Sequence, residues 1–408
     1  MELLVARQPI FDANKKIVAY ELLHREAGQT AYTQTDGDYA TSNVIASSFL
    51  SMGIQSLTSG KQAFINFTGD LLLSGVVTLL PSDQLVVELL EDIEPTPEVI
   101  AACRTLKDAG YVLALDDFVL RPDYRELIGL ADIIKVDFRL TDVGEQARII
   151  ADLKTPGLRF LAEKVETEQE FRYAVHLGYE LFQGYFFSRP TIISTGAVPI
   201  NKIGYLRLME ALSAEAPNMK EIASAIESDV GLSLETVKLV NSALFMRKQR
   251  INNIQQAVVM LGLEGVRKWV YLTALRRMGD SLTPDVLINT SLVRSKFMEL
   301  FAKCIGEGDR AREFTLLGLF SLLDAITRQP FAKLLENTNL TDEIKAVLVD
   351  GRYDSPLGQA YLLMGTYERG EWQTAMELCE RLAVRMDEAA LAYVNSLEWF
   401  NTNYLAFA

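Results

Sequence analysis

Short apolar runs separated by amphipathic stretches dominate the first half of the chain. Seven such runs, rich in Val, Ile, Leu, Phe and Tyr, are each short enough to form a buried strand. They cover residues 17–23, 63–67, 85–90, 111–116, 133–136, 158–163 and 181–187. This pattern predicts a sheet that is covered on its outer face.

Helical patterns lie between these runs. Residues 97–108 place apolar side chains along one helical face, and residues 167–177 open on Thr167 with Glu170 three positions later, a capping-box pattern. Strand–helix alternation favours a parallel α/β fold, and six to eight such units favour a TIM-like barrel. We therefore expect a (β/α) barrel over residues 1–190.

The pattern of apolar and polar residues changes after the last apolar run. Residues 191–200 include Gly196 and Pro199 and predict a linker. From residue 201 to residue 408 the apolar spacing is helical, with Gly and polar turns between the segments. The sequence predicts a separate all-α domain there.

Charge narrows the range of partners. The formal net charge is −14, which disfavours binding to polymeric nucleic acid. No apolar stretch approaches the roughly 20 residues that span a bilayer. Three cysteines without a CxxC pair disfavour a zinc site. We expect a cytoplasmic protein with no membrane span.

Polar side chains follow the apolar runs at or near their C-terminal ends. They are Glu21, Asn66, Glu88, Asp116 with Asp117, Lys135 with Asp137, Glu163 and Gln183. In a parallel barrel these ends gather on one face, where reaction centres are found. We expect the acidic groups to converge in a small space.

Converging carboxylates repel one another unless cations offset their charge. Carboxylate and amide oxygens without histidine favour Mg²⁺ or Mn²⁺ over zinc, and such a site suits attack of water on phosphorus. Taken singly, each residue could instead cap a helix or lie on the surface, and Lys135 could simply pair with Asp116 or Asp137.

The ordered set of motifs resembles the EAL-type cyclic-di-GMP phosphodiesterases over residues 1–190. The resemblance is carried by Arg7-Gln8-Pro9-Ile10, Tyr20-Glu21-Leu22-Leu23-His24-Arg25, Phe64-Ile65-Asn66-Phe67, Val87-Glu88-Leu89-Leu90-Glu91, Leu115-Asp116-Asp117-Phe118, Ile134-Lys135-Val136-Asp137, Ala162-Glu163-Lys164-Val165-Glu166-Thr167 and Gln183-Gly184-Tyr185-Phe186. It implies hydrolysis of cyclic-di-GMP to the linear dinucleotide pGpG.

The same resemblance implies a role for each matched residue. The metal ligands would be Glu21, Asn66, Glu88, Asp116 and Asp117. The catalytic residues would be Glu163, Lys135 and Gln183, and the substrate contacts Arg25, Gln8 and Asp137.

Two departures from the family pattern support an alternative. Residues 119–123 replace a small, Gly- and Ser-rich loop, and Lys164 stands where the family has glycine. The alternative is a catalytically degenerate barrel that senses cyclic-di-GMP or acts as a protein-interaction scaffold.

The second half resembles the HDOD family, an all-helical relative of the HD phosphohydrolases. The match rests on residues 239–245, with Asn241 and Ser242, and on residues 254–263. No histidine lies in this half, which excludes the histidine-ligated metal site of the HD hydrolases. We expect a bacterial signal transduction protein whose helical domain binds other signalling proteins or regulates the barrel. The choice between monomer and homodimer stays open.

Overall fold

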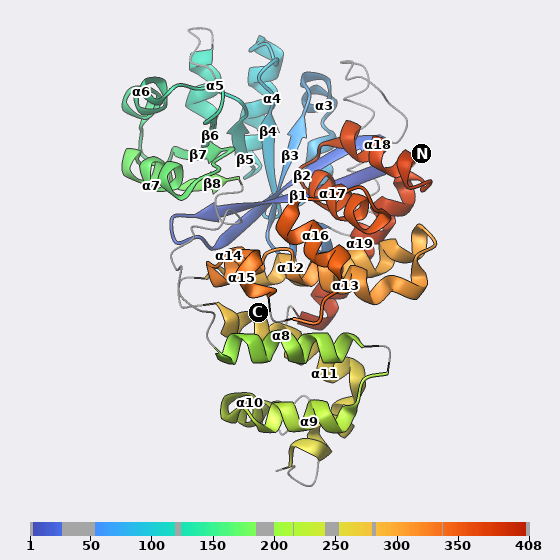
Figure 1. The fold of residues 1–408 in the computed structure, drawn as a ribbon. Helices are drawn as coiled ribbons and strands as arrows, with labels where there is room; N and C mark the ends of the chain where they lie inside the picture. The colour runs from blue at the N-terminus through green and yellow to red at the C-terminus, as the bar shows by residue number, and fades with distance from the viewer. Residues whose placement is uncertain are drawn as a thin grey trace. The chain divides into compact units, whose positions relative to one another are not determined.

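The computed structural model describes most of the chain (Figure 1). The described residues are 3–26, 54–118, 124–184, 200–214, 216–240, 253–279, 283–336 and 338–404. One unit contains residues 1–189 and 363–407, and the other contains residues 190–362. The chain thus leaves the first unit once and returns to it.

Eight strands close into a barrel in chain order. They are β1 (Leu3–Asp12), β2 (Ile17–Glu26), β3 (Gln62–Phe67), β4 (Leu85–Leu89), β5 (Val112–Leu115), β6 (Ile133–Asp137), β7 (Arg159–Glu163) and β8 (Leu181–Gln183). Strands β2 to β8 pair in parallel, whereas β1 runs antiparallel to both of its neighbours. The predicted TIM-like barrel is confirmed, with β1 added to the seven apolar runs.

Helices connect the parallel strands. They are α2 (Ile54–Thr58), α3 (Gly69–Ser74), α4 (Pro97–Asp108), α5 (Arg125–Leu130), α6 (Val143–Leu153) and α7 (Glu168–Leu177), with a 3-10 turn at Val76–Leu79. The predicted capping box is present at α7, where Thr167 and Glu170 satisfy each other's backbone N–H groups. At α4 the Thr96 side chain accepts a hydrogen bond from the Val99 N–H, and Pro97 follows in the first turn.

One buried apolar residue from each strand fills the barrel interior. This layer consists of Ile10, Ala19, Phe64, Val86, Ala114, Ile133, Leu161 and Leu181. Side chains in a strand alternate between faces with a period of two. The next inward-facing residue along each strand therefore lies directly above this layer, and it forms the site described below.

The last helices belong to the barrel unit. They are the end of α17 (Pro356–Glu368), α18 (Trp372–Arg381) and α19 (Met386–Tyr404). Tyr367 is fully buried and donates its hydroxyl hydrogen to the Val5 carbonyl oxygen at 3.2 Å. Asn401 donates to the Ser56 carbonyl oxygen at 2.5 Å. The predicted domain boundaries, with a linker over residues 191–200, stay a prediction.

The second unit contains helices throughout its described part, as predicted. They are α8 (Ile200–Ser213), α9 (Met219–Glu227), α10 (Val230–Val240), α11 (Ile254–Met278), α12 (Asp285–Cys304), α13 (Ala311–Phe320), α14 (Leu323–Thr327), α15 (Phe331–Leu334) and α16 (Asp342–Asp350). Gly262 interrupts α11 with a non-helical conformation. The HDOD-like residues Asn241 and Ser242 lie outside the described residues.

Among the helices that the structure describes, none combines the length and the apolar character needed to cross a membrane.

Candidate active site

A ring of eight polar residues lies one layer above the apolar core of the barrel. Each ring residue lies two positions from the apolar-layer residue of its own strand. All of them lie within their strands except Asp116, which directly follows the end of β5. The ring consists of Gln8, Glu21, Asn66, Glu88, Asp116, Lys135, Glu163 and Gln183. In β1 the step runs backwards, from Ile10 to Gln8, because β1 is antiparallel. The predicted convergence of strand-end residues is thus explained by the period of two.

Backbone hydrogen bonds continue past the strand ends and hold these residues in place. The Asp116 N–H donates to the Leu89 carbonyl oxygen at 2.9 Å, and the Phe118 N–H donates to that of Lys135 at 3.1 Å. Beyond β7, the Val165 N–H donates to the Gln183 carbonyl oxygen at 3.0 Å. The side chains are therefore presented by a continuous ladder rather than by free loops.

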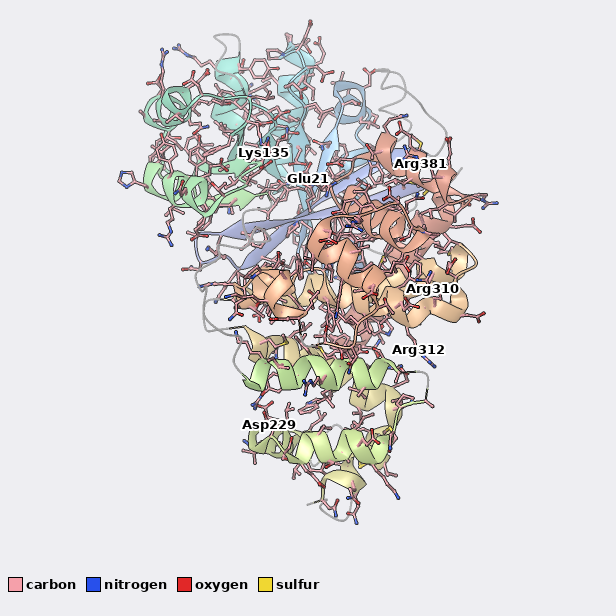
Figure 2. All side chains as sticks on the ribbon, in the orientation of Figure 1. Glu21, Lys135, Asp229, Arg310, Arg312 and Arg381 are labelled. Carbon is pink, nitrogen blue, oxygen red and sulfur yellow. The ribbon has the colours of Figure 1, made fainter. Side chains whose placement is uncertain are left out.

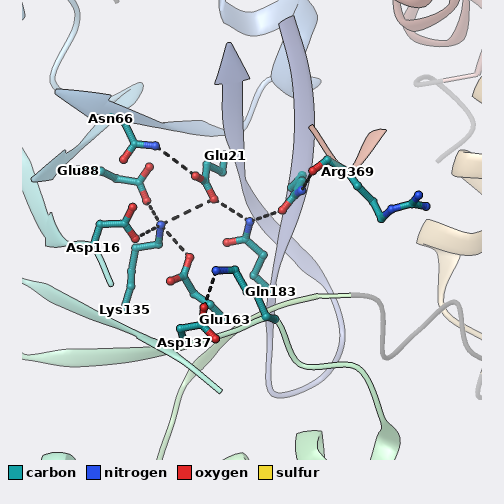
Figure 3. A network of polar contacts seen from close by, with 11 residues as sticks. Glu21, Asn66, Glu88, Asp116, Lys135, Asp137, Glu163, Gln183 and Arg369 are labelled. Atoms are coloured by element: carbon teal, nitrogen blue, oxygen red, sulfur yellow. Dashed lines mark hydrogen bonds and ion pairs between the residues drawn. The ribbon is translucent and has the colours of Figure 1, made fainter. Parts of the chain in front are cut away.

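Lys135 lies at the centre of the ring, with its side chain 0% exposed (Figure 3). Its Nζ atom is 2.6 Å from Glu88 Oε1, 2.6 Å from Asp116 Oδ1 and 2.9 Å from Glu163 Oε1. Glu21 Oε2 is farther away, at 3.7 Å. Figure 2 labels Glu21 and Lys135 within the barrel, and Figure 3 shows their contact from close by. Four strands thus direct a carboxylate at one ammonium group.

This cluster carries more negative than positive charge. Four ionised carboxylates against one ammonium would leave a net charge of −3 in a buried space. Burial, which Lys135 only partly offsets, raises the pKa of Glu88 and that of Glu163 well above the usual range. Burial alone would lower the pKa of Lys135, but the surrounding carboxylates, Asp116 foremost, raise it well above normal. A further cation would relieve this imbalance.

Amide groups, rather than Lys135, hold Glu21 most closely. Gln183 Nε2 donates to Glu21 Oε2 at 2.7 Å, and Asn66 Nδ2 donates to Glu21 Oε1 at 3.3 Å. Gln183 Nε2 also donates to Gln8 Oε1 at 2.7 Å. Glu21 is therefore oriented by its neighbours on β3 and β8.

The donor set fits a hard divalent cation. Within the described part of the chain, buried oxygens without a hydrogen-bond partner include Glu88 Oε2, Glu163 Oε2, Asp117 Oδ1 and Gln183 Oε1. Carboxylate oxygens of Asp116, Asp117 and Glu163 lie within 4.8 Å of one another. Unsatisfied buried oxygens are costly, and bound cations are one way to satisfy them.

Two residues beside the site have left-handed backbone conformations that favour glycine. Asp117 has φ 38°, and Lys164 has φ 52°. The Lys164 ammonium forms an ion pair with Asp137, whose side chain is 3% exposed. Asp137 Oδ1 also accepts hydrogen bonds from the N–H groups of Arg139 and Leu140, at 2.6 Å and 3.1 Å. The Lys164–Asp137 pair was not anticipated from the sequence, although the glycine expected at position 164 was a signal.

The structure brings together ten of the eleven predicted site residues as side chains in or beside the ring. Arg25 belongs to β2, but its side chain lies outside the described residues. The altered segment 119–123 also lies outside them. Gln8, predicted as a substrate contact, lies in the ring beside Gln183, at the position that counting β1 backwards from Ile10 gives.

Comparison with known proteins matches both halves of the chain. The EAL domain matches residues 41–190, and the HDOD domain matches residues 200–345. The uncharacterized protein YuxH of Bacillus subtilis is 39% identical over 98% of this chain and 98% of its own length. The chain belongs to the family in which an EAL domain precedes an HDOD domain.

A second relative of this EAL–HDOD protein carries a functional name. The cyclic di-GMP phosphodiesterase CdgJ of Vibrio cholerae is 32% identical over 97% of this chain and 91% of its own length. Among solved structures, an EAL domain protein from Listeria monocytogenes is 22% identical and covers 46% of this chain and 88% of that chain, with a TM-score of 0.36. In the EAL–HDOD protein, Glu21 precedes the matched EAL segment by 20 residues and still joins its site.

Proposed function

We propose that the EAL–HDOD protein is a cyclic-di-GMP phosphodiesterase that uses Mg²⁺ or Mn²⁺ to hydrolyse the cyclic dinucleotide to linear pGpG. One observation carries the proposal: four carboxylates, three of them buried, surround a single ammonium group, and adjacent buried oxygens lack partners. A stable fold with this excess of buried negative charge calls for further cations. The same proposal assigns the protein to bacterial signalling in the cytoplasm.

The residues present divide between two cation positions. Glu21, Asn66, Glu88 and Asp116 come from four consecutive strands or their ends and would hold the first cation. Asp117, close to Asp116 and Glu163, would hold the second. Divalent cations supply two things here: a lower pKa for water and neutralisation of charge on the phosphate.

The remaining ring residues supply orientation and proton transfer. Glu163 would accept the proton of the attacking water, because one of its oxygens lies 2.9 Å from Lys135 and the other has no hydrogen-bond partner. The Lys135 ammonium stabilises the negative charge that develops on the phosphate oxygens. Gln183 fixes Glu21 through a 2.7 Å hydrogen bond.

The substrate assignment rests on the family and on the named relative. CdgJ is a cyclic di-GMP phosphodiesterase by name and matches nearly the full chain. Arg25 would contact a substrate phosphate, since a guanidinium fork suits phosphate oxygens. Asp137, held by Lys164 and two backbone N–H groups, would help to orient the bound substrate.

One observation favours a second candidate function, a barrel that binds the dinucleotide without hydrolysing it. Lys164 adopts a strained backbone conformation and places a permanent positive charge beside Asp137 and Asp117. A lysine in this position could offset carboxylate charge in place of one cation. The site would then retain affinity for the substrate with little turnover.

The helical unit would act as the interaction and regulatory module. Large apolar side chains such as Leu234 and Val259 are 54% and 78% exposed in that unit. Exposed apolar residues on helices suit contacts with partner proteins. We propose other signalling proteins as those partners.

Chromatography after incubation with cyclic-di-GMP and Mn²⁺ separates the candidates. Wild type should yield the linear dinucleotide, Glu163→Gln should yield little, and the exposed control Glu94→Gln should match wild type. If wild type yields no product but gives saturable heat in calorimetric titration with the dinucleotide, the binding function replaces the enzyme. Neither product nor heat would leave only a scaffold.

A further inference from the structure

A chain of amide hydrogen bonds leads out of the site to Arg369, in the turn between α17 and α18 (Figure 3). Gln183 Nε2 donates to both Glu21 Oε2 and Gln8 Oε1, each at 2.7 Å. Gln8 Nε2 in turn donates to the Arg369 carbonyl oxygen at 3.2 Å. The amide of Gln8 is thus engaged on both sides by the protein itself.

The segment that receives this chain is firmly placed against the first two strands. Tyr367 is fully buried, and its hydroxyl donates to Val5 on β1 at 3.2 Å. Its ring contacts those of Tyr393 and Trp372, with centroids 5.0 Å and 5.2 Å away. Residues 367–370 therefore reach β1 through two hydrogen bonds, one of which ends on Gln8.

Gly370 makes the same segment fit against β2. Its φ is 68°, and a Cβ atom added there would lie 2.7 Å from Leu23 Cδ1. Leu23 is two residues from Glu21 on the same strand. An alanine at position 370 would be strained at this φ and would crowd Leu23, so that either the Leu23 side chain or residues 367–370 must shift.

Glu21 is the carboxylate most dependent on this chain. Its closest oxygen is 3.7 Å from Lys135, whereas Glu88, Asp116 and Glu163 approach within 2.9 Å. Its orientation therefore relies on amide donors, and the shorter of its two amide hydrogen bonds comes from Gln183. Groups that orient metal ligands affect metal affinity strongly.

We propose that Gln8 is a positioning residue that couples residues 367–370 to Glu21, so that docking of the last helices sets the affinity of the site for a divalent cation. This inference rests on the proposed function, because Glu21 is one of the ligands assigned there. Helix α17 begins in the helical unit and ends at Glu368 in the barrel unit. The chain therefore connects the helical unit directly to residues 367–370, which the proposed coupling links to Glu21.

Calorimetric titration of the full chain with Mn²⁺ tests the coupling without requiring turnover. The variants are Gln8→Met, which keeps the shape but removes the amide, Gly370→Ala, and the two combined. Tyr367→Phe removes only a hydroxyl and serves if Gly370→Ala fails to fold. Gly75→Ala is the matched control, because Gly75 has φ 73° and open space around its Cβ position.

Gln8→Met should weaken Mn²⁺ binding about tenfold. Gly370→Ala and Tyr367→Phe should weaken it several-fold, and the double variant should be no weaker than Gln8→Met, because both changes break one path. Gly75→Ala should bind like wild type.

Several results would overturn the coupling. One is wild-type affinity in Gln8→Met, or in both Gly370→Ala and Tyr367→Phe. Another is a double variant in which the two losses of affinity multiply. A third is no Mn²⁺ binding by wild type. A wild type that binds Mn²⁺ but does not hydrolyse cyclic-di-GMP would sink the proposed function and leave the coupling standing.

Discussion

Lys135 allows four carboxylates to share one buried space. Its ammonium lies within 2.9 Å of three of them and 3.7 Å from the fourth. A buried ion cluster contributes little net stability, but removing one partner leaves uncompensated charge. Lys135 is therefore needed to offset the carboxylate charge of the site in the folded barrel.

We expect Lys135→Met to lower the free energy of unfolding by about 3–5 kcal/mol, with part of the loss recovered by Mn²⁺. The reason is that the cation would replace the missing positive charge. Urea unfolding followed by circular dichroism, with and without Mn²⁺, measures both effects. Lys15→Met, which breaks a partly exposed pair with Glu168, should cost at most about 1 kcal/mol. Equal stability of the two variants would contradict this account of Lys135.

At the scale of residues, the strand period accounts for how the strand-end side chains come together, because it fixes which of them face inward. Glu88 and Lys135 follow from that period once their strands are recognised. The pairing of Lys164 with Asp137 does not, because it depends on a left-handed backbone conformation at Lys164. Local sequence does not determine such a conformation in a lysine.

At the scale of elements, β8 depends on a glycine directly after it. Gly184 has φ 140°, and a Cβ atom there would overlap the Val165 carbonyl oxygen. This close approach is what lets β8, and with it Gln183, continue the ladder beyond β7.

Gly184→Ala should therefore destabilise the barrel unit by about 3 kcal/mol or more, since it combines backbone strain with a steric overlap. Thermal unfolding would measure the loss. Gly60→Ala offers the comparison, because Gly60 has φ 78° but nothing within 4 Å of its Cβ position, and should cost only about 1 kcal/mol. Similar losses in both variants would show that the overlap is relieved without cost.

A second element, α14 of the helical unit, carries a partly buried carboxylate, that of Asp324. Burial raises the pKa of Asp324 to about 6, although its carboxylate accepts a hydrogen bond from the Ala325 N–H at 2.8 Å. The folded pKa exceeds that of the unfolded chain, so the penalty is full above about pH 6 and disappears as the pH falls towards 4.

Asp324→Asn should accordingly stabilise the helical unit by about 1–2 kcal/mol at pH 7.5 and by almost nothing at pH 4. Melting temperatures at the two pH values measure this change. The exposed Asp309→Asn serves as control and should show no such gain at pH 7.5. A gain in Asp324→Asn that is independent of pH would contradict the burial argument.

The sequence predicted the parallel strands but not the full neighbourhood of β1. Val, Ile and Leu in short runs identify buried strands directly. The antiparallel pairing of β1 with β8 joins residues about 170 positions apart, as in Ile10 opposite Gln183, and no local pattern specifies it. Likewise, the apolar face of α19 predicts that this helix is buried. It does not predict that the helix packs against β1, as it does in the structure.

At the scale of the whole molecule, the barrel unit is built from two separated stretches of chain. Residues 1–189 form the barrel and residues 363–407 complete its packing, while residues 190–362 form the helical unit between them. Helical periodicity continues without interruption across residue 363, which is why the sequence places residues 201–408 in one domain. The partner of a helix is decided by side-chain complementarity, which periodicity alone does not encode.

We propose that the polar ring of the barrel hydrolyses cyclic-di-GMP with a divalent cation. The most direct test is the initial rate of linear dinucleotide formation by the full chain as Mn²⁺ is titrated, for wild type and Glu88→Gln side by side. We predict a rate that saturates with Mn²⁺, vanishes in EDTA and falls at least about 100-fold in Glu88→Gln. No product from folded wild type at any Mn²⁺ concentration, or an equal rate in Glu88→Gln, would contradict the claim.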